Sequence, residues 1–214
     1  MRCLQCMKEY HSDYEMCPFC GYVQNTEPKE LYFLRPGTVI ADRYVVGVSI
    51  GSGGFGITYK AWDRTLSKIV AIKEYYPAGL VNRVPGEKKM IIYSGSRERE
   101  CANGKVRFLD EARNMAKFNT HPNIINVYDF FEENNTAYII MEFLDGENYK
   151  EYIKKQGGRV SVDKALEVTR AVLEALSEVH KSGILHRDIS PDNIFICRDG
   201  RIKLIDFGAG SYIG

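Results

Sequence analysis

The amino-acid sequence predicts an α+β fold in which a cysteine-rich segment precedes an antiparallel sheet and a set of helices. Runs of β-branched and aromatic residues recur between residues 44 and 143, with turn residues between them. Helical spacing of apolar residues marks two segments, 106–118 and 161–182. Two Cys-x-x-Cys pairs fall within the first 21 residues.

The composition argues against two classes of partner. The 214 residues carry 29 Lys and Arg against 28 Asp and Glu, a net charge of +1. This balance gives no electrostatic reason to expect nucleic acid or a membrane surface as the main partner. No apolar run is long enough to span a bilayer and the N-terminus has no apolar leader, so we expect a cytoplasmic protein. The length accommodates one sizeable domain, or a small one and most of a larger one.

Residues 1–22 carry a metal-binding pattern. Cys3 and Cys6 form one pair and Cys17 and Cys20 the other, with ten residues between the pairs. Four thiolates at two turns are the ligand set of a structural zinc site, and zinc would supply the folding free energy that so short a segment lacks. The segment resembles a small zinc ribbon, and we expect it to have a structural role or to bind a protein partner. Two disulfides are the alternative, which nothing in the sequence favours because no feature indicates an oxidising compartment.

Residues 23–36 show no helical or strand period and are expected to form a linker. Beyond them, strand candidates at 44–50 and 57–62 flank a glycine-rich stretch at 51–56, GSGGFG. Dinucleotide-binding folds place a helix after such glycines, but residues 57–62 are β-branched and aromatic, so the glycines close a hairpin. A loop of this kind can donate backbone N–H groups to phosphates without side chains in the way.

A lysine and a glutamate form a candidate ion pair. Lys73 ends a strand candidate, where a lysine is ordinarily solvated. Glu111, however, falls on the apolar stripe of helix 106–118, and a carboxylate on a buried face needs a cation, for which Lys73 is the candidate. Asp110 points elsewhere. Residues 74–105 are expected to form an insertion, either functional or disordered. The stripe of the helix comprises Phe108, Ala112 and Met115.

Two further strands, at 127–132 and 136–143, complete the expected sheet. A helix is then expected from the N-cap Ser161 to about residue 182, with Gly183 ending it. The apolar stripe of this helix, which we expect to pack, comprises Val162, Leu166, Thr169, Leu173, Leu176 and His180.

Residues 194–205 are expected to form a β-hairpin with its turn at an Asp-Gly pair. The hairpin would place Asn193 and Asp206 side by side at its open end, where a carboxamide oxygen and a carboxylate can share Mg²⁺. Asp188, five residues before Asn193, could accept a proton. The alternative is an ordinary hairpin with solvated acids at its mouth.

Taken in order, these motifs resemble those of the protein kinase family, and most closely its bacterial, eukaryotic-like serine/threonine members. The resemblance implies a bilobal fold over residues 37–214, with a five-stranded antiparallel sheet and one helix in the first lobe and an incomplete helical second lobe. The matching motifs are GSGGFG at 51–56, VAIK at 70–73, Glu111 in its helix, HRD at 186–188 with Asn193, and DFG at 206–208.

The resemblance also implies a site for ATP and Mg²⁺. Asp188 corresponds to the catalytic base, and Asn193 and Asp206 to the Mg²⁺ ligands. Lys73, oriented by Glu111, corresponds to the lysine that holds the α- and β-phosphates. The residues implied to bind the nucleotide are Gly51, Ser52, Gly53, Gly54, Phe55, Gly56, Thr58, Ala71, Lys73, Met141, Glu142, Leu144 and Phe195.

The sequence departs from the family pattern at several places. Thr58 stands where kinases carry Val, and Ser190 stands where serine/threonine kinases usually carry a Lys near the transferred phosphate. The insertion at 74–105 is longer than the usual connection. The chain stops at Gly214, six residues after the DFG motif, so we expect the activation segment and the helices that follow it to be missing.

Three functional hypotheses follow. The first is an ATP-dependent kinase that phosphorylates Ser or Thr of a protein substrate, with the ribbon as a docking module. The second is a nucleotide-binding pseudokinase or scaffold, inactive because the lower lobe is incomplete. The third is a zinc-ribbon adaptor whose kinase remnant is inert.

Overall fold

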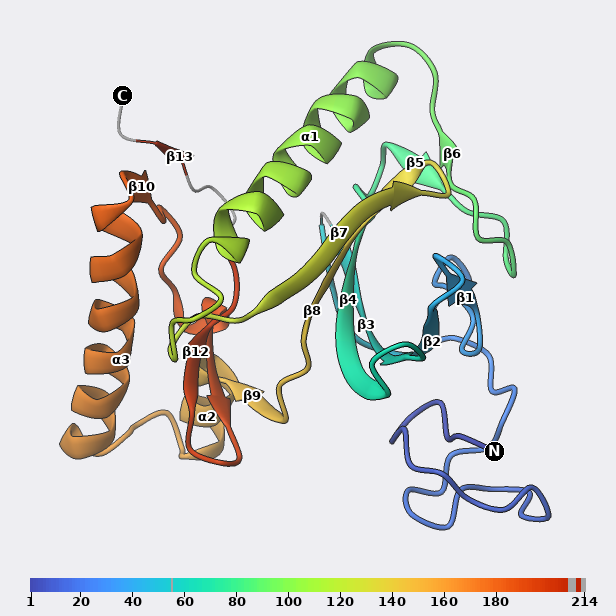
Figure 1. Ribbon diagram of the computed structural model, residues 1–214, viewed down its shortest axis with the longest axis horizontal. Coiled ribbons are helices and arrows are strands. Elements are labelled where there is room, and N and C mark those ends of the chain that lie inside the picture. Colours follow the sequence, from blue (N-terminus) through green and yellow to red (C-terminus); the bar gives the residue numbers. More distant parts are fainter. Residues whose placement is uncertain (55, 208–210, 213–214) are drawn as a thin grey trace. The chain divides into compact units, whose positions relative to one another are not determined.

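The computed structural model describes residues 1–54, 56–207 and 211–212. The chain divides into two units, one formed by Met1–Leu109 with Asp129–Phe143 and the other by Asp110–Tyr128 with Leu144–Gly214. The first unit holds the cysteine ribbon, which we define as residues 1–22, and most of a curled antiparallel sheet (Figure 1). The second unit holds most of the helical part of the chain and a small three-stranded sheet.

The large sheet has six strands in the order β1-β2-β3-β4-β8-β7. Alternation of half-buried and buried residues along β3 reflects the period-two pattern of its sequence. The expected sheet had five strands; the sixth is the two-residue β1, which pairs with the start of β2. The strands are β1 Val39–Ile40, β2 Tyr44–Gly53, β3 Gly56–Asp63, β4 Lys68–Tyr75, β7 Val127–Glu133 and β8 Thr136–Glu142.

Helix α1 (Ser96–Ala116) is longer than the predicted helix at 106–118. Its buried residues are Cys101, Phe108, Leu109, Ala112 and Met115. The Tyr75 hydroxyl donates a hydrogen bond to the Cys101 carbonyl at 3.2 Å, which fixes the first turns of α1 against the end of β4. The last part of the expected insertion is therefore helical. The rest of it contains the short pair β5 (Val81–Asn82) and β6 (Ile91–Ile92).

The face of the sheet opposite Lys73 is covered by a buried polar network. Glu74 and Arg83 form an ion pair in which both side chains are fully buried. The Tyr59 hydroxyl donates to Glu74 Oε2 at 3.0 Å and accepts from the Leu34 amide at 3.0 Å. Arg83 also donates to the Tyr32 carbonyl at 2.9 Å. The end of the expected linker is therefore packed into the first unit rather than extended in solvent.

The second unit is organised around the hairpin formed by β11 (Ile194–Cys197) and β12 (Ile202–Leu204). Strand β9 (Gly146–Asn148) pairs with the other edge of β11. A Cβ at Gly146 would collide with the Ile196 carbonyl, so glycine permits this close approach. The remaining elements are α2 Tyr149–Lys155, α3 Val162–Lys181, β10 Ile184–Leu185, the 3-10 turn Pro191–Asn193 and β13 Ser211–Tyr212.

Helix α3 begins and ends as predicted but buries a different face. The Ser161 hydroxyl accepts a hydrogen bond from the Lys164 amide at 3.2 Å, and Gly183 has a φ of +74°. The predicted stripe is wrong, because Val162, Leu166 and Leu173 are exposed, as is His180. The buried face consists of Val168, Ala171, Ala175 and Val179. Small residues allow the helix to lie close to its neighbours β10 and β12.

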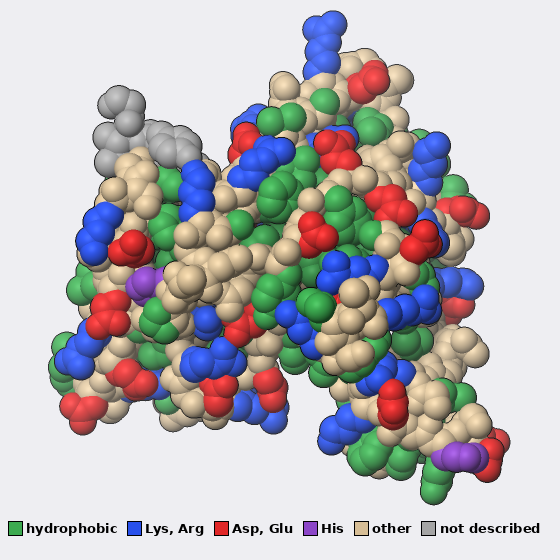
Figure 2. Space-filling view, in the orientation of Figure 1, with side chains coloured by type: hydrophobic (Ala, Val, Ile, Leu, Met, Phe, Trp, Pro, Cys, Tyr) green, Lys and Arg blue, Asp and Glu red, His purple; other side chains and the backbone are tan. Residues whose placement is uncertain are grey.

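Basic and acidic side chains are interspersed over the face of the molecule shown in Figure 2. This distribution agrees with the near-neutral net charge of +1. Among the residues that the structure describes, no helix combines the length and the apolar character needed to cross a membrane.

Candidate functional site

The four cysteines of the ribbon converge on one point. The Sγ atoms of Cys3, Cys6, Cys17 and Cys20 all lie within 4.8 Å of one another. Cys3 Sγ lies 3.6 Å from Cys20 Sγ, and Cys6 Sγ lies 3.7 Å from Cys17 Sγ. Four sulfurs bound to one tetrahedral zinc at about 2.3 Å would be about 3.8 Å apart. The side chains therefore fit a zinc ion. All six cysteines of the chain are free thiols in the structure.

Each Cys-x-x-Cys pair is held in the same kind of turn. The Met7 amide donates to the Cys3 carbonyl at 3.0 Å, and the Gly21 amide donates to the Cys17 carbonyl at 2.8 Å. Met7 and Gly21 both have positive φ, at 65° and 73°. The amide of Cys6 also points at Cys3 Sγ, 3.4 Å away. Backbone N–H groups directed at sulfur stabilise a thiolate, the form that binds metal.

The thiols differ in proton affinity. Burial raises the pKa of Cys20 to about 12. Burial also acts to raise the pKa of Cys17, but hydrogen bonds from the backbone of Phe19 and Cys20 outweigh it and lower the pKa to about 7. Of these two thiols, Cys17 therefore loses its proton more readily. A bound cation would also favour the thiolate form of Cys20.

The sheet register brings part of the predicted nucleotide site into one row. Gly51 lies opposite Thr58, and Thr58 lies opposite Lys73. Residues opposite each other in an antiparallel ladder share a face, and so do residues two apart in a strand. Ala71 and its partner Met141 therefore lie on the same face as Lys73. This face carries the residues expected around the adenine and the phosphates.

The glycine-rich stretch forms the expected hairpin between β2 and β3. Gly53 pairs with Gly56, and a Cβ at Gly51, Gly53 or Gly54 would meet no atom within 4 Å. Their backbone is thus open to a ligand from the solvent side. A Cβ at Gly56 would instead lie 2.7 Å from the Glu74 carbonyl oxygen. Ser52 is exposed in β2, whereas the predicted contact of Phe55 lies outside the described residues.

Lys73 extends toward α1. Its Nζ lies 5.7 Å from the ring centroid of Phe108. Glu111 follows Phe108 by three residues, so the two share one face of the helix. Glu111 is half-buried, while Asp110 is exposed and pairs with Arg113 at 2.5 Å. We expected Glu111 to lie on the buried face of the helix and Asp110 to point away from it, and their positions agree with this. The pairing of Lys73 with Glu111 remains a prediction.

The expected hinge residues fall at the end of β8. Met141 is buried and Glu142 is half-buried within the strand, and Leu144, which lies beyond it, is buried. Phe195, expected under the adenine, is half-buried in β11 and pairs with Asn148 of β9. Strand β9 was not predicted, because its three residues are too few to show a period.

The loop before β11 brings the predicted base and a predicted metal ligand together. Asn193 Nδ2 donates to Asp188 Oδ2 at 2.9 Å and to the Asp188 carbonyl at 3.0 Å. Arg187, just before Asp188, has a φ of +63°, an uncommon conformation for a residue with a side chain. The Asp188 amide donates to His186 Nδ1 at 3.3 Å. This turn directs Asp188 toward Asn193.

The hairpin register differs from the expected one by one residue. Ile194 lies opposite Leu204, and the Ile205 amide donates to the Asn193 carbonyl at 3.0 Å. Asn193 therefore lies opposite Ile205, and Asp206 is the next residue along. Asp206 still lies at the open end of the hairpin, one residue beyond the position opposite Asn193.

A buried histidine supports the same loop and was expected to pack there. The ring of His186 lies 5.1 Å from that of Phe207, and Phe207 also contacts Phe118. Burial lowers the pKa of His186, although the neighbouring Asp206 and Asp188 act in the opposite direction. A neutral His186 can keep Nδ1 as an acceptor for the Asp188 amide.

The comparisons with known proteins agree with these motifs. Residues 44–214 match the protein kinase domain family. The serine/threonine-protein kinase PrkC of Bacillus subtilis is 34% identical over 172 residues, which cover 80% of this chain and 23% of that protein. The serine/threonine-protein kinase PknG of Mycolicibacterium smegmatis is 31% identical over 201 residues, covering 91% of this chain and 22% of that protein.

A solved structure shows the same fold. The structure described as PpkA-294 apo form has 33% sequence identity and a TM-score of 0.78, with 83% of this chain and 62% of that chain covered. The chain spans about a quarter of the length of the curated relatives it matches.

Proposed function

Because this chain belongs to the serine/threonine protein kinase family, we propose that it transfers the γ-phosphoryl group of ATP to a serine or threonine of a protein substrate. The fold is that of a protein kinase, with the curled antiparallel sheet in the first unit. The kinase domain would comprise residues 37–214, and residues 1–22 would form a zinc ribbon joined to it by residues 23–36.

The observation that carries the proposal is the paired geometry of Asp188 and Asn193. Asn193 turns its amide nitrogen to Asp188, so its carboxamide oxygen is the atom left to face a cation. Asp188 is exposed and can accept a proton from a hydroxyl group. Asp206 follows the residue opposite Asn193 and supplies a carboxylate, which is the ligand type that Mg²⁺ prefers.

The remaining residues would bind and orient the nucleotide. Lys73 would hold the α- and β-phosphates beneath the glycine-rich hairpin, with Glu111 orienting its ammonium group. Bound Mg²⁺ would supply charge neutralisation at the phosphates. Met141, Glu142 and Leu144 would border the adenine. Six free thiols suit a reducing compartment, and we place the protein in the cytoplasm.

The test separates nucleotide binding from phosphoryl transfer. We expect the purified chain to bind ATP in the presence of Mg²⁺ and to phosphorylate itself or a generic acceptor protein. Asp206→Ala should abolish the Mg²⁺-dependent binding. Asp188→Asn should retain binding and slow the transfer at least about a hundredfold, the range for loss of a general base. Asp192→Asn is the matched control, because Asp192 is an exposed acid of the same loop that pairs with Lys150 at 3.1 Å.

One residue supports the alternative of a nucleotide-binding pseudokinase or scaffold. Ser190 occupies the position where serine/threonine kinases carry a lysine, and its side chain makes no capping hydrogen bond to the turn that follows. Without that cation, binding could persist while transfer fails. If the wild type and Ser190→Lys bind ATP equally and only Ser190→Lys transfers phosphate, the chain is a binding module. If neither binds ATP, both functions are excluded.

The four cysteines would hold one zinc ion and give the ribbon the rigidity to engage a protein partner. The support is the convergence of four sulfurs at the spacing of a tetrahedral site. Metal analysis should find about one zinc per chain, the stoichiometry of a four-cysteine site. A chain with less than a tenth of that amount would contradict this assignment.

A further inference from the structure

The first cysteine knuckle, residues 3–7, contacts the strand that leads into the glycine-rich hairpin. Leu4 lies between the two cysteines of this knuckle, and its carbonyl accepts a hydrogen bond from the Val48 amide at 3.0 Å. Val48 belongs to β2 and is followed at once by Ser49, Ile50 and Gly51. The ribbon is thus bonded to the backbone directly before the predicted phosphate-binding glycines.

Strand β2 is irregular at the point of contact. Its ladder to β3 shifts register between Val46 and Ser49 and again between Ser49 and Gly51. Register shifts of this kind leave backbone groups outside the regular ladder. The Val48 amide, which lies within the irregular part of the β2–β3 ladder, donates to the Leu4 carbonyl instead. The ribbon therefore supplies a backbone acceptor for this part of β2.

Glycine at position 47 is required for this contact. A Cβ there would collide with the Leu4 carbonyl oxygen and with Met7 Cε, and it would lie 2.9 Å from the Lys60 carbonyl oxygen. The knuckle therefore lies against bare backbone. Val48 also packs against the apolar cluster of the ribbon, which includes Cys3 and Cys17.

A second contact reaches the neighbouring strand. The Arg2 guanidinium lies over the ring of Trp62 in β3, 3.4 Å from its centroid. Arg2 is in turn fixed by the Met7 carbonyl, which accepts from Nη1 at 2.6 Å. The two contacts, one from Leu4 and one from Arg2 beside the knuckle, join the ribbon to both strands that form the glycine-rich hairpin.

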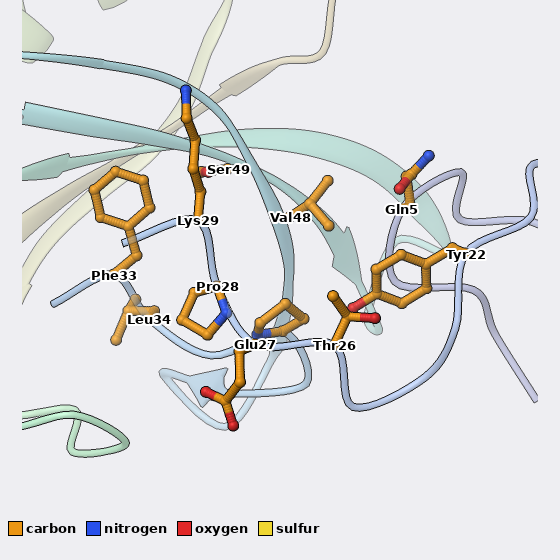
Figure 3. Close-up of a pocket in the computed structure, with 11 residues that line it drawn as sticks. Gln5, Tyr22, Thr26, Glu27, Pro28, Lys29, Phe33, Leu34, Val48 and Ser49 are labelled. Atoms are coloured by element: carbon orange, nitrogen blue, oxygen red, sulfur yellow. The ribbon is translucent and has the colours of Figure 1, made fainter. Parts of the chain in front are cut away.

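A pocket lies beside this stretch of β2, between it, the ribbon and the joining segment. This pocket of about 270 Å³ is lined by Val48 and Ser49 of β2, by Gln5 and Tyr22 of the ribbon, and by the segment 26–36. Figure 3 shows Val48 and Ser49 with the ribbon residues and the linker residues around the opening. Beside this pocket, the Val48 amide is held by its hydrogen bond to the Leu4 carbonyl of the knuckle.

We infer that the first cysteine knuckle is a positioning element for the glycine-rich hairpin, so that metal held by the four cysteines strengthens nucleotide binding. A bound metal fixes Cys3 and Cys6, and thereby the Leu4 carbonyl between them. Leu4 fixes Val48, and Val48 fixes the approach to Gly51. Without metal the knuckle becomes more mobile and no longer holds the hairpin in place. The hairpin must then be ordered when the nucleotide binds, and the free energy this costs lowers the affinity for nucleotide. This inference rests on the proposed function.

The binding test uses the whole chain in two ways. First, zinc is removed with a zinc-selective chelator and then restored, while ATP affinity is measured in excess Mg²⁺. Second, Gly47→Ala is compared with the wild type, because it separates the knuckle from β2 and leaves all four cysteines in place. We expect both changes to weaken ATP binding by about fivefold to tenfold, the value of one backbone hydrogen bond. Zinc restoration should reverse the first change.

The matched control is Phe19→Ala. Phe19 is exposed on the second knuckle and lies under Lys8, within the ribbon. We expect this variant to keep its zinc and the affinity of the wild type for ATP. Equal weakening in Phe19→Ala and Gly47→Ala would show a general loss of ribbon structure and would contradict a role for the Leu4 contact.

Hydrogen exchange gives a readout that does not depend on nucleotide. Removal of zinc, or Gly47→Ala, should raise the exchange rate of the amides at 48–53 about tenfold, while the amides of β4 remain protected. Unchanged exchange at 48–53, together with unchanged ATP affinity, would overturn the inference. If the wild type binds no ATP, the proposed function fails and the exchange rates alone decide whether the knuckle positions the hairpin.

Discussion

Arg83 and Glu74 form an ion pair in which neither side chain is exposed to solvent. Glu74 follows Lys73 in β4, and Arg83 comes from the segment between β4 and α1. Arg83 binds both carboxylate oxygens of Glu74 and the Tyr32 carbonyl, while Tyr59 donates to the carboxylate. The attraction between the two charges is strong because no water screens them, and the loss of either leaves the other uncompensated.

We expect Arg83→Met to lower the free energy of unfolding by about 3 to 5 kcal/mol, the usual cost of removing one partner from a buried ion pair. The double variant Glu74→Gln with Arg83→Met removes both charges and should recover most of this loss. Urea unfolding followed by far-UV circular dichroism measures both. If the double variant is as unstable as the single one, packing rather than charge accounts for the loss.

Removal of the metal should destabilise the ribbon. Cys17→Ser should lose zinc and expose Tyr10 and Tyr22, which are packed with the cysteines. Cys101→Ser is the control, because Cys101 is buried in α1 away from the cluster. Metal analysis and limited proteolysis of residues 1–36 measure the difference. Zinc retained by Cys17→Ser at the level of the wild type would contradict a four-cysteine site.

Acid should weaken the interaction between Asp63 and Arg43. Burial acts to raise the pKa of Asp63, but hydrogen bonds from Arg43 and from the amides of Leu66 and Thr65 outweigh it and lower the pKa. A carboxylate with a lowered pKa in the folded state contributes stability above its unfolded pKa of about 3.9, and this contribution is lost as the pH falls below that value.

The wild type should therefore lose more stability than Asp63→Asn when the pH is lowered from 5 to about 3, a range that spans the unfolded pKa. Arg43 donates to the two carboxylate oxygens at 2.9 and 2.7 Å, which is the interaction that Asp63→Asn removes. Thermal unfolding at several pH values measures the difference. Parallel curves for the two proteins would show that Asp63 does not cause the acid sensitivity.

The N-cap of α3 gives a smaller, local prediction. Ser161→Ala removes the acceptor of the Lys164 amide and should cost about 1 kcal/mol. Ser182→Ala, at the other end of the helix, removes only a long contact of 3.5 Å to the Glu178 carbonyl and should change stability by less than about 0.5 kcal/mol. Equal losses in chemical denaturation would argue against capping by Ser161.

The sequence was most informative where chemistry and local pattern coincide. The spacing of five residues between Asp188 and Asn193 predicted that both belong to one site, and in the structure a hydrogen bond joins them. The glycine-rich hairpin and the N-cap Ser161 were also predicted, because turns and caps depend on neighbouring residues. The two consecutive asparagines between β7 and β8 both adopt positive φ, as expected at a hairpin turn.

Features that depend on distant packing were predicted less well. The face of α3 was assigned from its large apolar residues, but the helix buries Ala171 and Ala175, whose small size suits a close approach. The start of α1 was placed too late because its first turns are charged, although Cys101 continues the buried stripe and could have indicated the extension. Nothing local to Arg83 indicates a partner in β4, so that pair needed the fold.

The segment that joins the ribbon to the sheet is itself part of the interior. Phe33 and Leu34 are 2% and 1% exposed, and the Leu34 amide is bonded to the Tyr59 hydroxyl in β3. A ribbon attached in this way cannot be exchanged between proteins as an independent cassette. Recombination that transferred residues 1–22 to another kinase would leave behind both the bare backbone at Gly47 and the aromatic contacts of the joining segment. Substitutions in the ribbon and in this sheet are therefore constrained by the same contacts, at Gly47 and at the Leu34 amide.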